Sequence, residues 1–142
     1  MDESGGRRRP LFVLSGLIVG LAAGMLAMRR LDVVEVTGRS MAPTLAPGDW
    51  LVVESLTYAR RLPQVGEIVL TRDPRQRSRE LIKRVHVRDG SWLELRGDAP
   101  QESTDSRAFG PVAGAGIRWR AVARCWPRRR VRWFGREPGS PG

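Results

Sequence analysis

The sequence contains very little cysteine and very little histidine. Cys125 is the single cysteine in 142 residues, so the chain cannot form an intramolecular disulfide or a cysteine-based metal site. His86 is the single histidine, which argues against a histidine-rich metal centre. We therefore expect neither a metal nor a cofactor, and both oxidising and reducing compartments remain open.

Lysine is nearly absent although basic residues are plentiful. Lysine and arginine together number 25, and Lys83 is the only lysine among them. Arginine stays protonated in proteins, whereas a buried lysine can lose its proton. Lys83 is therefore a candidate for a neutral amine. The alternative is that a single lysine has fallen there by chance.

The net charge of +10 suits acidic lipid headgroups or nucleic acid. No helix-turn-helix, zinc-finger or RNP-like motif is present, so nucleic acid is not the expected partner. The basic tail, residues 127–142, mixes arginines with Trp133 and Phe134, and Trp126 directly precedes it. Such a tail suits anionic headgroups at a membrane interface, and a solvated basic end is an equal alternative.

Residues 11–28, Leu11 to Met28, carry no charge and follow a short basic segment, residues 1–10. As a helix they would span roughly 27 Å, close to the thickness of a bilayer core. No small-x-small cleavage site precedes Arg29, unlike the end of a signal peptide. We expect a single-pass helix in the cell membrane. Flanking arginines slightly favour a cytoplasmic N-terminus and leave the side of the following domain open.

After residue 30 the pattern changes to short apolar runs separated by turns, which predicts a mostly β domain over residues 31–126. The expected strands cover residues 33–36, 50–54, 67–71, 80–88, 91–96 and 117–125. Asp89-Gly90 predicts a tight hairpin between the fourth and fifth of these strands. Residues 72–79 read as a charged loop and residues 97–116 as irregular structure.

Strand alternation predicts the surroundings of Lys83. One face carries Leu81, Lys83, Val85 and Val87, and the other carries Ile82, Arg84, His86 and Arg88. Burial on an apolar face lowers a lysine pKa and allows the amine to act as a general base. Because His86 falls on the opposite face, a Ser-His-Asp triad is not expected. A structural lysine at the edge of the core is the alternative.

Ser40 lies between a strand-like run and a segment rich in turn formers, including Pro43, Pro47 and Gly48. Proline fixes φ and removes a hydrogen-bond donor, so this segment is predicted to be a rigid loop. A rigid loop can present a nucleophilic hydroxyl. Most serines in such loops only bond their own backbone, which is the simpler interpretation of Ser40 taken alone.

These residues together resemble a known family. Three motifs carry the resemblance: Ser40-Met41-Ala42-Pro43-Thr44-Leu45, Lys83-Arg84-Val85, and Gly97-Asp98 with Ser103-Thr104-Asp105-Ser106-Arg107 and Gly110-Pro111-Val112. They look like the boxes of type I signal peptidases, which are Ser/Lys peptidases. The short Lys83-to-Gly97 spacing and the Arg72-Asp73-Pro74-Arg75 segment are most similar to nickel-type superoxide dismutase maturation proteases.

The resemblance implies a coiled antiparallel β-sheet like that of LexA-like self-cleaving repressors, following one transmembrane helix. It implies that Ser40 is the nucleophile, Lys83 the general base and Ser103 the residue that orients the lysine amine. The other implied roles are an ion-pair network of Arg84, Asp105 and Arg107, and an oxyanion site at the Ser40 N–H beside Met41. Implied substrates are extended peptides with small residues at −1 and −3.

Three positions depart from the family pattern. Gly38 stands where some members have a serine hydroxyl that helps to bind the oxyanion, which leaves the second donor unassigned. Ala99 replaces the asparagine of the family's Gly-Asp-Asn. The Asp89-Gly90 hairpin takes the place of a Gly-x-Pro-Gly-Asp segment. Because Ser40 and Lys83 are retained, an active enzyme is still expected.

The sequence therefore predicts a membrane-anchored serine endopeptidase that removes an N-terminal leader or propeptide, with nickel-type superoxide dismutase as one candidate substrate. One alternative is a general signal peptidase for exported preproteins. Another is a non-enzymatic, membrane-tethered basic module that binds anionic lipid or nucleic acid. A degenerate peptidase that retains only the fold is a third.

Overall fold

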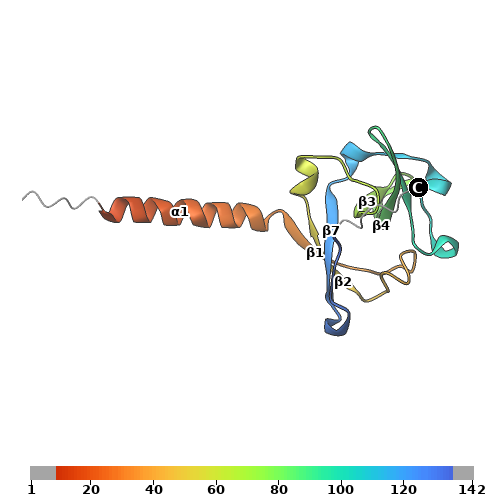
Figure 1. Cartoon of the computed structure of the whole chain (residues 1–142), viewed down its shortest axis with the longest axis horizontal. Helices are drawn as coiled ribbons and strands as arrows, with labels where there is room; N and C mark the ends of the chain where they lie inside the picture. Colours follow the sequence, from red (N-terminus) through yellow and green to blue (C-terminus); the bar gives the residue numbers. More distant parts are fainter. Residues whose placement is uncertain (1–8, 136–142) are drawn as a thin grey trace, which may run out of the picture. The chain divides into compact units, whose positions relative to one another are not determined.

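The computed structural model describes residues 9–135 and divides the chain at residue 30 into two compact units. In its described residues the first unit contains the helix α1, Arg9–Met28, and the second unit contains the β domain that begins at Leu31 (Figure 1). Within the described residues, no helix combines the length and hydropathy that crossing a membrane requires.

The β domain is built on one antiparallel sheet, which confirms the predicted mostly β class (Figure 1). Among the described residues its order is β1-β2-β7-β3-β4-β5-β6, with β8 paired to β7. The strands are β1 Leu31–Glu35, β2 Trp50–Glu54, β3 Ile68–Asp73, β4 Gln76–Asp89, β5 Trp92–Arg96, β6 Val112–Ala113, β7 Trp119–Trp126 and β8 Arg132–Trp133. The short helices are η1 Thr57–Ala59, η2 Pro100–Glu102, α2 Ser106–Phe109, η3 Gly114–Gly116 and η4 Arg128–Arg130.

Two apolar clusters form the core of the domain. The first joins the β1–β2 region to the middle of the sheet and consists of Val36, Met41, Leu45, Leu51, Val53, Ile68, Leu70 and Ala121. The second lies under β4 and β5 and consists of Val69, Val85, Leu93, Leu95 and Ile117. Burial of these side chains is the main driving force that holds the sheet together.

The prediction of a charged loop at residues 72–79 is wrong. The chain turns at Pro74 and Arg75, and β4 begins at Gln76. Asp73 is buried and accepts hydrogen bonds from both the backbone and the side chain of Arg75, which closes the turn within two residues. The charged residues misled the sequence reading because this part of β4 is exposed, where charge does not oppose a strand. The expected irregular stretch 97–116 in fact contains η2, α2, β6 and η3.

The β4–β5 hairpin is confirmed, with Asp89 opposite Trp92 and Gly90 at a φ of 57° that suits glycine. A register shift separates Val85 from Val87 in this hairpin. Val87 is consequently exposed, so the expectation that it shares the buried face of Lys83 is wrong. A bulge adds a residue to one strand and reverses the alternation beyond it.

Part of the basic tail is folded onto the domain. β8 pairs with β7, and Phe134 packs against the first core cluster. The Arg130 side chain reaches the buried carboxylate of Asp49 at 3.3 Å. Residues 136–142 of the tail, like the predicted basic segment up to residue 8, lie outside the described residues.

Candidate active site

Ser40 lies in a loop that leaves β1 and returns to β2. Two backbone hydrogen bonds of 2.8 Å close the loop at its base. The Val36 N–H donates to the Asp49 carbonyl, and the Gly48 N–H donates to the Val36 carbonyl. Met41 and Leu45 are fully buried in the first core cluster and anchor the loop from below. The apolar residues of the motif thus fix the loop, and Ser40 stays partly exposed above them.

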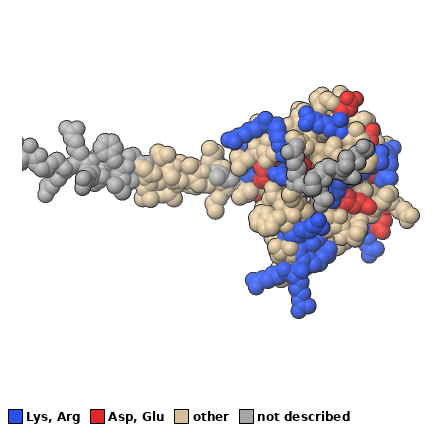
Figure 2. Space-filling view, viewed as in Figure 1, with Lys and Arg blue, Asp and Glu red and all other residues tan. Residues whose placement is uncertain are grey.

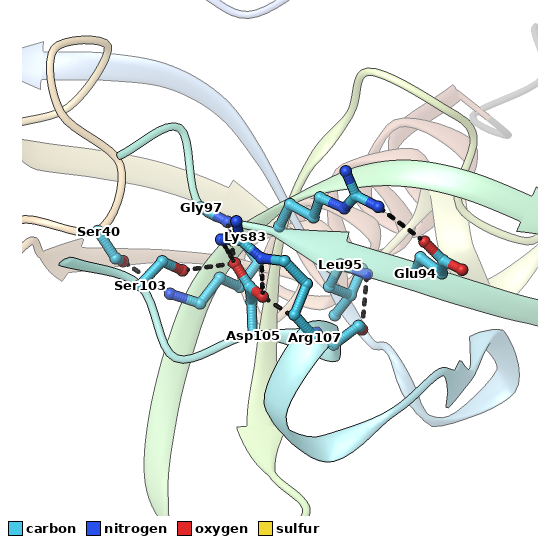
Figure 3. A network of polar contacts seen from close by, with 10 residues as sticks. Ser40, Lys83, Glu94, Leu95, Gly97, Ser103, Asp105 and Arg107 are labelled. Atoms are coloured by element: carbon cyan, nitrogen blue, oxygen red, sulfur yellow. Dashed lines mark hydrogen bonds and ion pairs between the residues drawn. The ribbon is translucent and has the colours of Figure 1, made fainter. Parts of the chain in front are cut away.

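Lys83 lies in the middle of β4, opposite Val69 on β3. Its side chain is on the buried face, as the alternation predicted, and only 2% of the residue is exposed. The Lys83 Nζ donates a hydrogen bond to the Ser40 Oγ at 2.7 Å (Figure 3). The sheet therefore brings together two residues that stand 43 positions apart in the sequence.

The environment of Lys83 shifts its titration toward the neutral amine. Burial lowers its pKa from 10.5 to about 8 and is the largest cause. The Asp105 charge opposes this shift, whereas the Arg79 and Arg107 charges add to it. An amine with a pKa near 8 is partly deprotonated close to neutral pH, which a general base requires.

Asp105 is the centre of the polar cluster next to Lys83, and it caps α2 (Figure 3). Its carboxylate accepts hydrogen bonds from Ser103 Oγ at 2.8 Å, Gly97 N at 3.1 Å and Arg107 Nη2 at 2.6 Å. Burial alone raises the pKa of Asp105, but these hydrogen bonds outweigh it and hold the pKa well below its usual range. The Ser103 hydroxyl thus bonds to Asp105, and its expected role in orienting Lys83 stays a prediction.

The expected network of Arg84 with Asp105 and Arg107 needs correction, because the ion pairs divide differently. Arg107 pairs with Asp105, whereas Arg84 pairs with Asp98 through two hydrogen bonds of 2.7 and 2.9 Å. Asp98 also accepts a side-chain hydrogen bond from Thr44, in the loop that carries Ser40. Arg84 therefore lies on the opposite side of β4 from Lys83, as expected, and connects through Asp98 to the Ser40 loop.

Gly97 packs so closely against Ser40 and Ser103 that no side chain fits there. A methyl group added there would clash with Ser103 Oγ and with the carbonyl oxygen of Ser40. The same carbonyl accepts a hydrogen bond of 2.9 Å from the N–H of Ala99. Sequence reasoning noted the Gly97-Asp98 pair and the missing asparagine, but it could not show that the Ala99 backbone holds the nucleophile's own carbonyl.

A buried ion cluster at the far end of the Ser40 loop was missed. Arg124 of β7 donates to the carbonyl of Thr44 at 2.7 Å and to Asp49 at 3.2 Å, and Arg130 also pairs with Asp49. The Asp49 carboxylate in addition accepts from the N–H of Ala46 at 2.9 Å. In the sequence, Arg124 is one arginine among many, so only its depth in the sheet identifies it.

The backbone around Ser40 leaves donors free. Among the described residues, no acceptor is hydrogen-bonded to the N–H of Ser40 or of Met41. The Met41 side chain is buried in the core, so this residue faces the site only through its backbone. The expected oxyanion position at Ser40 is consistent with these free donors.

A cleft of about 750 Å³ opens beside Ser40 and Lys83. Its two long walls are residues 34–41, from β1 into the Ser40 loop, and residues 77–83 of β4. In the described chain, β1 pairs on one side only, and β4 pairs with β5 only from Arg84 onward. Both walls therefore present strand edges whose backbone groups can pair with an extended peptide. Within the described residues, no three metal-ligating side chains gather.

Known proteins of similar sequence carry the names of proteases and processing peptidases. Residues 10–99 match the family described as signal peptidase, peptidase S26. The chain is 31% identical to mitochondrial inner membrane protease subunit 2 of Danio rerio, covering 99% of this chain and 89% of the relative. It is 32% identical to mitochondrial ATP-independent inner membrane protease subunit 1a of Arabidopsis thaliana, covering 68% and 71%. It is also 25% identical to thylakoidal processing peptidase 1 of that plant, covering 68% and 42%.

Proposed function

The chain belongs to the signal peptidase family, peptidase S26, and from that premise we propose that it is a serine endopeptidase with Ser40 as nucleophile and Lys83 as general base. Its substrate is a polypeptide from which it removes an N-terminal leader or propeptide. The single observation that carries this proposal is the 2.7 Å contact between a buried lysine amine and the Ser40 hydroxyl.

The proposed reaction begins with Lys83 as a neutral amine. In that form the hydrogen bond runs from the Ser40 O–H to the lysine nitrogen, and the amine accepts the proton as Ser40 Oγ attacks the scissile carbonyl. The resulting ammonium then gives the proton to the leaving amine, and an acyl-enzyme remains. Water, deprotonated by the same lysine, hydrolyses the ester and restores the Ser40 hydroxyl.

The oxyanion of each tetrahedral intermediate needs hydrogen-bond donors. The Ser40 N–H supplies one, and its freedom from other acceptors in the described chain supports this assignment. The Met41 N–H is an additional candidate next to it. The hydrogen bond from the Ala99 N–H to the Ser40 carbonyl holds the Ser40–Met41 peptide plane, which fixes the orientation of the Met41 N–H.

The cleft fits an extended substrate. A peptide lying between residues 34–41 and residues 77–83 can add its backbone to both strand edges, which gives affinity that does not depend on sequence. Specificity then comes from side chains at alternate positions, which is compatible with the small residues at −1 and −3 that the family resemblance implies.

Membrane association is part of the proposal. The uncharged sequence from residue 11 to residue 28 falls within α1, and the protein from Danio rerio bears the name of an inner membrane protease. The exposed indoles of Trp50, Trp126 and Trp133 occur in the same part of the sheet as η4, whose Arg128 and Arg129 are exposed. Figure 2 shows one group of basic side chains at the lower end of the domain and others over the rest of this face. Such a surface suits anionic headgroups.

The narrower assignment, maturation of nickel-type superoxide dismutase, rests only on the resemblance in the short Lys83-to-Gly97 spacing and in the Arg72-Asp73-Pro74-Arg75 segment. A general signal peptidase differs from it only in substrate. The non-enzymatic basic module differs in kind, because polyanion binding weakens steeply as salt rises, whereas peptide cleavage along a backbone cleft should not.

The proposal is tested with the full chain in detergent and an internally quenched leader peptide that has alanine at −1 and −3. Wild type, Ser40→Ala and Lys83→Arg are compared across pH. Arginine keeps the positive charge but cannot release its proton at usable pH. We expect both variants to lose cleavage by a factor of at least about 10³. Thermal unfolding of each variant shows whether the fold is retained.

Normal cleavage by Lys83→Arg would make the lysine structural and refute the general-base assignment. Normal cleavage by Ser40→Ala would refute the nucleophile. If wild type cleaves none of several leader peptides yet binds anionic vesicles or nucleic acid in a salt-dependent manner, the binding module becomes the better proposal.

A further inference from the structure

The β3–β4 hairpin brings arginines to the rim of the cleft. Arg72, Arg77 and Arg79 are exposed and line it. Across residues 9–135, none of the three has an ion pair or a side-chain hydrogen bond, whereas Arg75 in the same hairpin pairs with Asp73 and lies over the ring of Phe109. The cleft lining also carries Glu35, Glu80 and Glu102, but its arginines outnumber these carboxylates.

Arg77 and Arg79 are the most available of these side chains. Arg72 lies directly across the strand pair from Glu80, whose opposite charge offsets it. Arg79 is on the same strand as Lys83, four residues away, which is roughly 13 Å along a β-strand. Its charge lowers the pKa of Lys83, which places Arg79 within electrostatic reach of the reacting atoms.

We propose that the cleft selects substrates that carry a carboxylate side chain a few residues from the scissile bond, and that Arg77 and Arg79 bind this carboxylate. This inference rests on the proposed peptidase function and adds a substrate class to it. Guanidinium groups match the two oxygens of a carboxylate and remain charged at all relevant pH values.

A lipid headgroup would also carry a suitable negative charge, but the position of the two arginines favours a peptide. They line the same cleft as Ser40 and Lys83, and this lining contains no aromatic side chain. Exposed indoles occur near η4, at Trp126 and Trp133, and at Trp92, which lines a separate pocket together with Arg77. Arg79 is not among the residues that line that pocket. The charge at the hairpin is thus placed where a bound substrate strand passes.

The test uses the full chain in detergent and quenched peptides with alanine at −1 and −3. One glutamate, glutamine or lysine is moved through each of the other positions on both sides of the scissile bond. At the best position we expect wild type to cleave the glutamate peptide about tenfold more efficiently than the glutamine peptide. Raising the salt concentration should reduce this ratio.

Variants then assign the preference to the two arginines. Arg77→Gln with Arg79→Gln should bring the glutamate-to-glutamine ratio close to one, and Arg77→Glu with Arg79→Glu should favour the lysine peptide. The matched control is Arg128→Gln with Arg129→Gln, which removes the same charge from η4 and should leave the ratio unchanged. Ratios within one enzyme cancel any change in the pKa of Lys83.

Equal cleavage of all three peptides at every position by wild type would overturn the inference and leave the peptidase proposal intact. A preference for glutamate that survives in Arg77→Gln with Arg79→Gln would also overturn it. The inference would likewise be overturned if this double variant kept its peptide preference and lost only its binding to phosphatidylglycerol vesicles. The two arginines would then bind lipid and not the substrate. Failure of wild type to cleave any peptide would refute the proposed function itself.

Discussion

Two buried ionisable side chains of the β domain, Glu67 and Lys83, differ in their partners: Glu67 has several charged partners and Lys83 has none in an ion pair within the described residues. The Glu67 carboxylate accepts hydrogen bonds from Tyr58 at 2.9 Å, from the N–H of Gln64 at 3.0 Å and from Arg61, and it pairs with Arg120 at 3.3 Å. Burial alone raises the pKa of Glu67, but these partners outweigh it and the net shift is downward. Glu67 therefore stays charged and joins β3 to the segment before it.

Lys83 is buried to a similar degree, yet the hydrogen bond of its amine goes to the neutral hydroxyl of Ser40. Within the described residues, no carboxylate forms an ion pair with it, and Asp105 acts on it only through its charge. A buried charge with full pairing is retained, whereas a buried amine without it loses its proton at a lower pH than an exposed lysine does. Both side chains are buried, so the presence or absence of ion-pair partners distinguishes Glu67, a structural residue, from Lys83, the candidate general base.

Apart from replacing Ser40 or Lys83 themselves, the largest effect is expected from Gly97→Ala, which disturbs the contacts around Ser40 and leaves those of Glu67 intact. The added methyl group must displace either Ser103 or the backbone carbonyl of Ser40. Displacing a nucleophile by about 1 Å can cost about 10²-fold in rate, so we expect kcat/KM for a leader peptide to fall by about that factor or more.

Gly116→Ala is the matched control, because nothing lies within 4 Å of a methyl group at Gly116. We expect this variant to cleave like wild type, with both variants compared by steady-state kinetics and thermal unfolding. Wild-type activity in Gly97→Ala would show that the close contact with the Ser40 carbonyl has no part in catalysis.

Glu67→Gln breaks the structural cluster instead. Removing the charge of the buried Glu67 weakens its bonds to the partly exposed Arg61 and Arg120 and leaves Arg120 only the longer contact of 3.9 Å with Glu54. We expect the free energy of unfolding to fall by about 2 kcal/mol. Cleavage below the unfolding transition should be unchanged, because Glu67 does not touch Ser40 or Lys83. Urea unfolding and kcat/KM measured on the same preparations check both statements. Lost activity with unchanged stability would contradict the structural role.

Sequence alone predicted the residues of the candidate site better than the contacts between them. The alternation in β4 put Lys83 on the apolar face, and the Pro-rich loop put Ser40 above the core, because both depend on local patterns. The partner of Arg84 could not be predicted, since Asp98 and Asp105 are both acidic residues in one motif and only their three-dimensional positions distinguish them.

Two further features depend on long-range structure in the same way. The register shift beyond Val85 arises from pairing with β5, and no sequence signal marks it. The pairing of Arg124 with Asp49 joins positions 75 residues apart in a chain with many arginines. Charge patterns also misled the prediction at residues 72–79, where exposed strands tolerate charge as readily as loops do.

A smaller effect should follow from Arg79→Gln, which makes the surroundings of Lys83 more like those of an ordinary lysine. The Arg79 charge lowers the pKa of Lys83, so its removal should raise this pKa. The pH at which kcat/KM for a neutral peptide reaches half its maximum should then move upward. Arg60→Gln, which removes an exposed arginine that does not line the cleft, is the control and should leave the profile in place. An unchanged profile in Arg79→Gln would separate this arginine from the reacting amine.

The most direct test of the difference between Glu67 and Lys83 is the pKa of Lys83, measured by NMR. Because Lys83 is the only lysine, ¹³C-lysine labelling of the full chain gives signals from that residue alone. The chemical shift of its Cε carbon, followed against pH in detergent, reports the titration of the adjacent amine. We expect a midpoint at about 8 in the folded protein and near the ordinary 10.5 in denaturant. A folded-state midpoint near 10.5 would mean that Lys83 stays an ammonium at neutral pH, which would contradict its role as the general base.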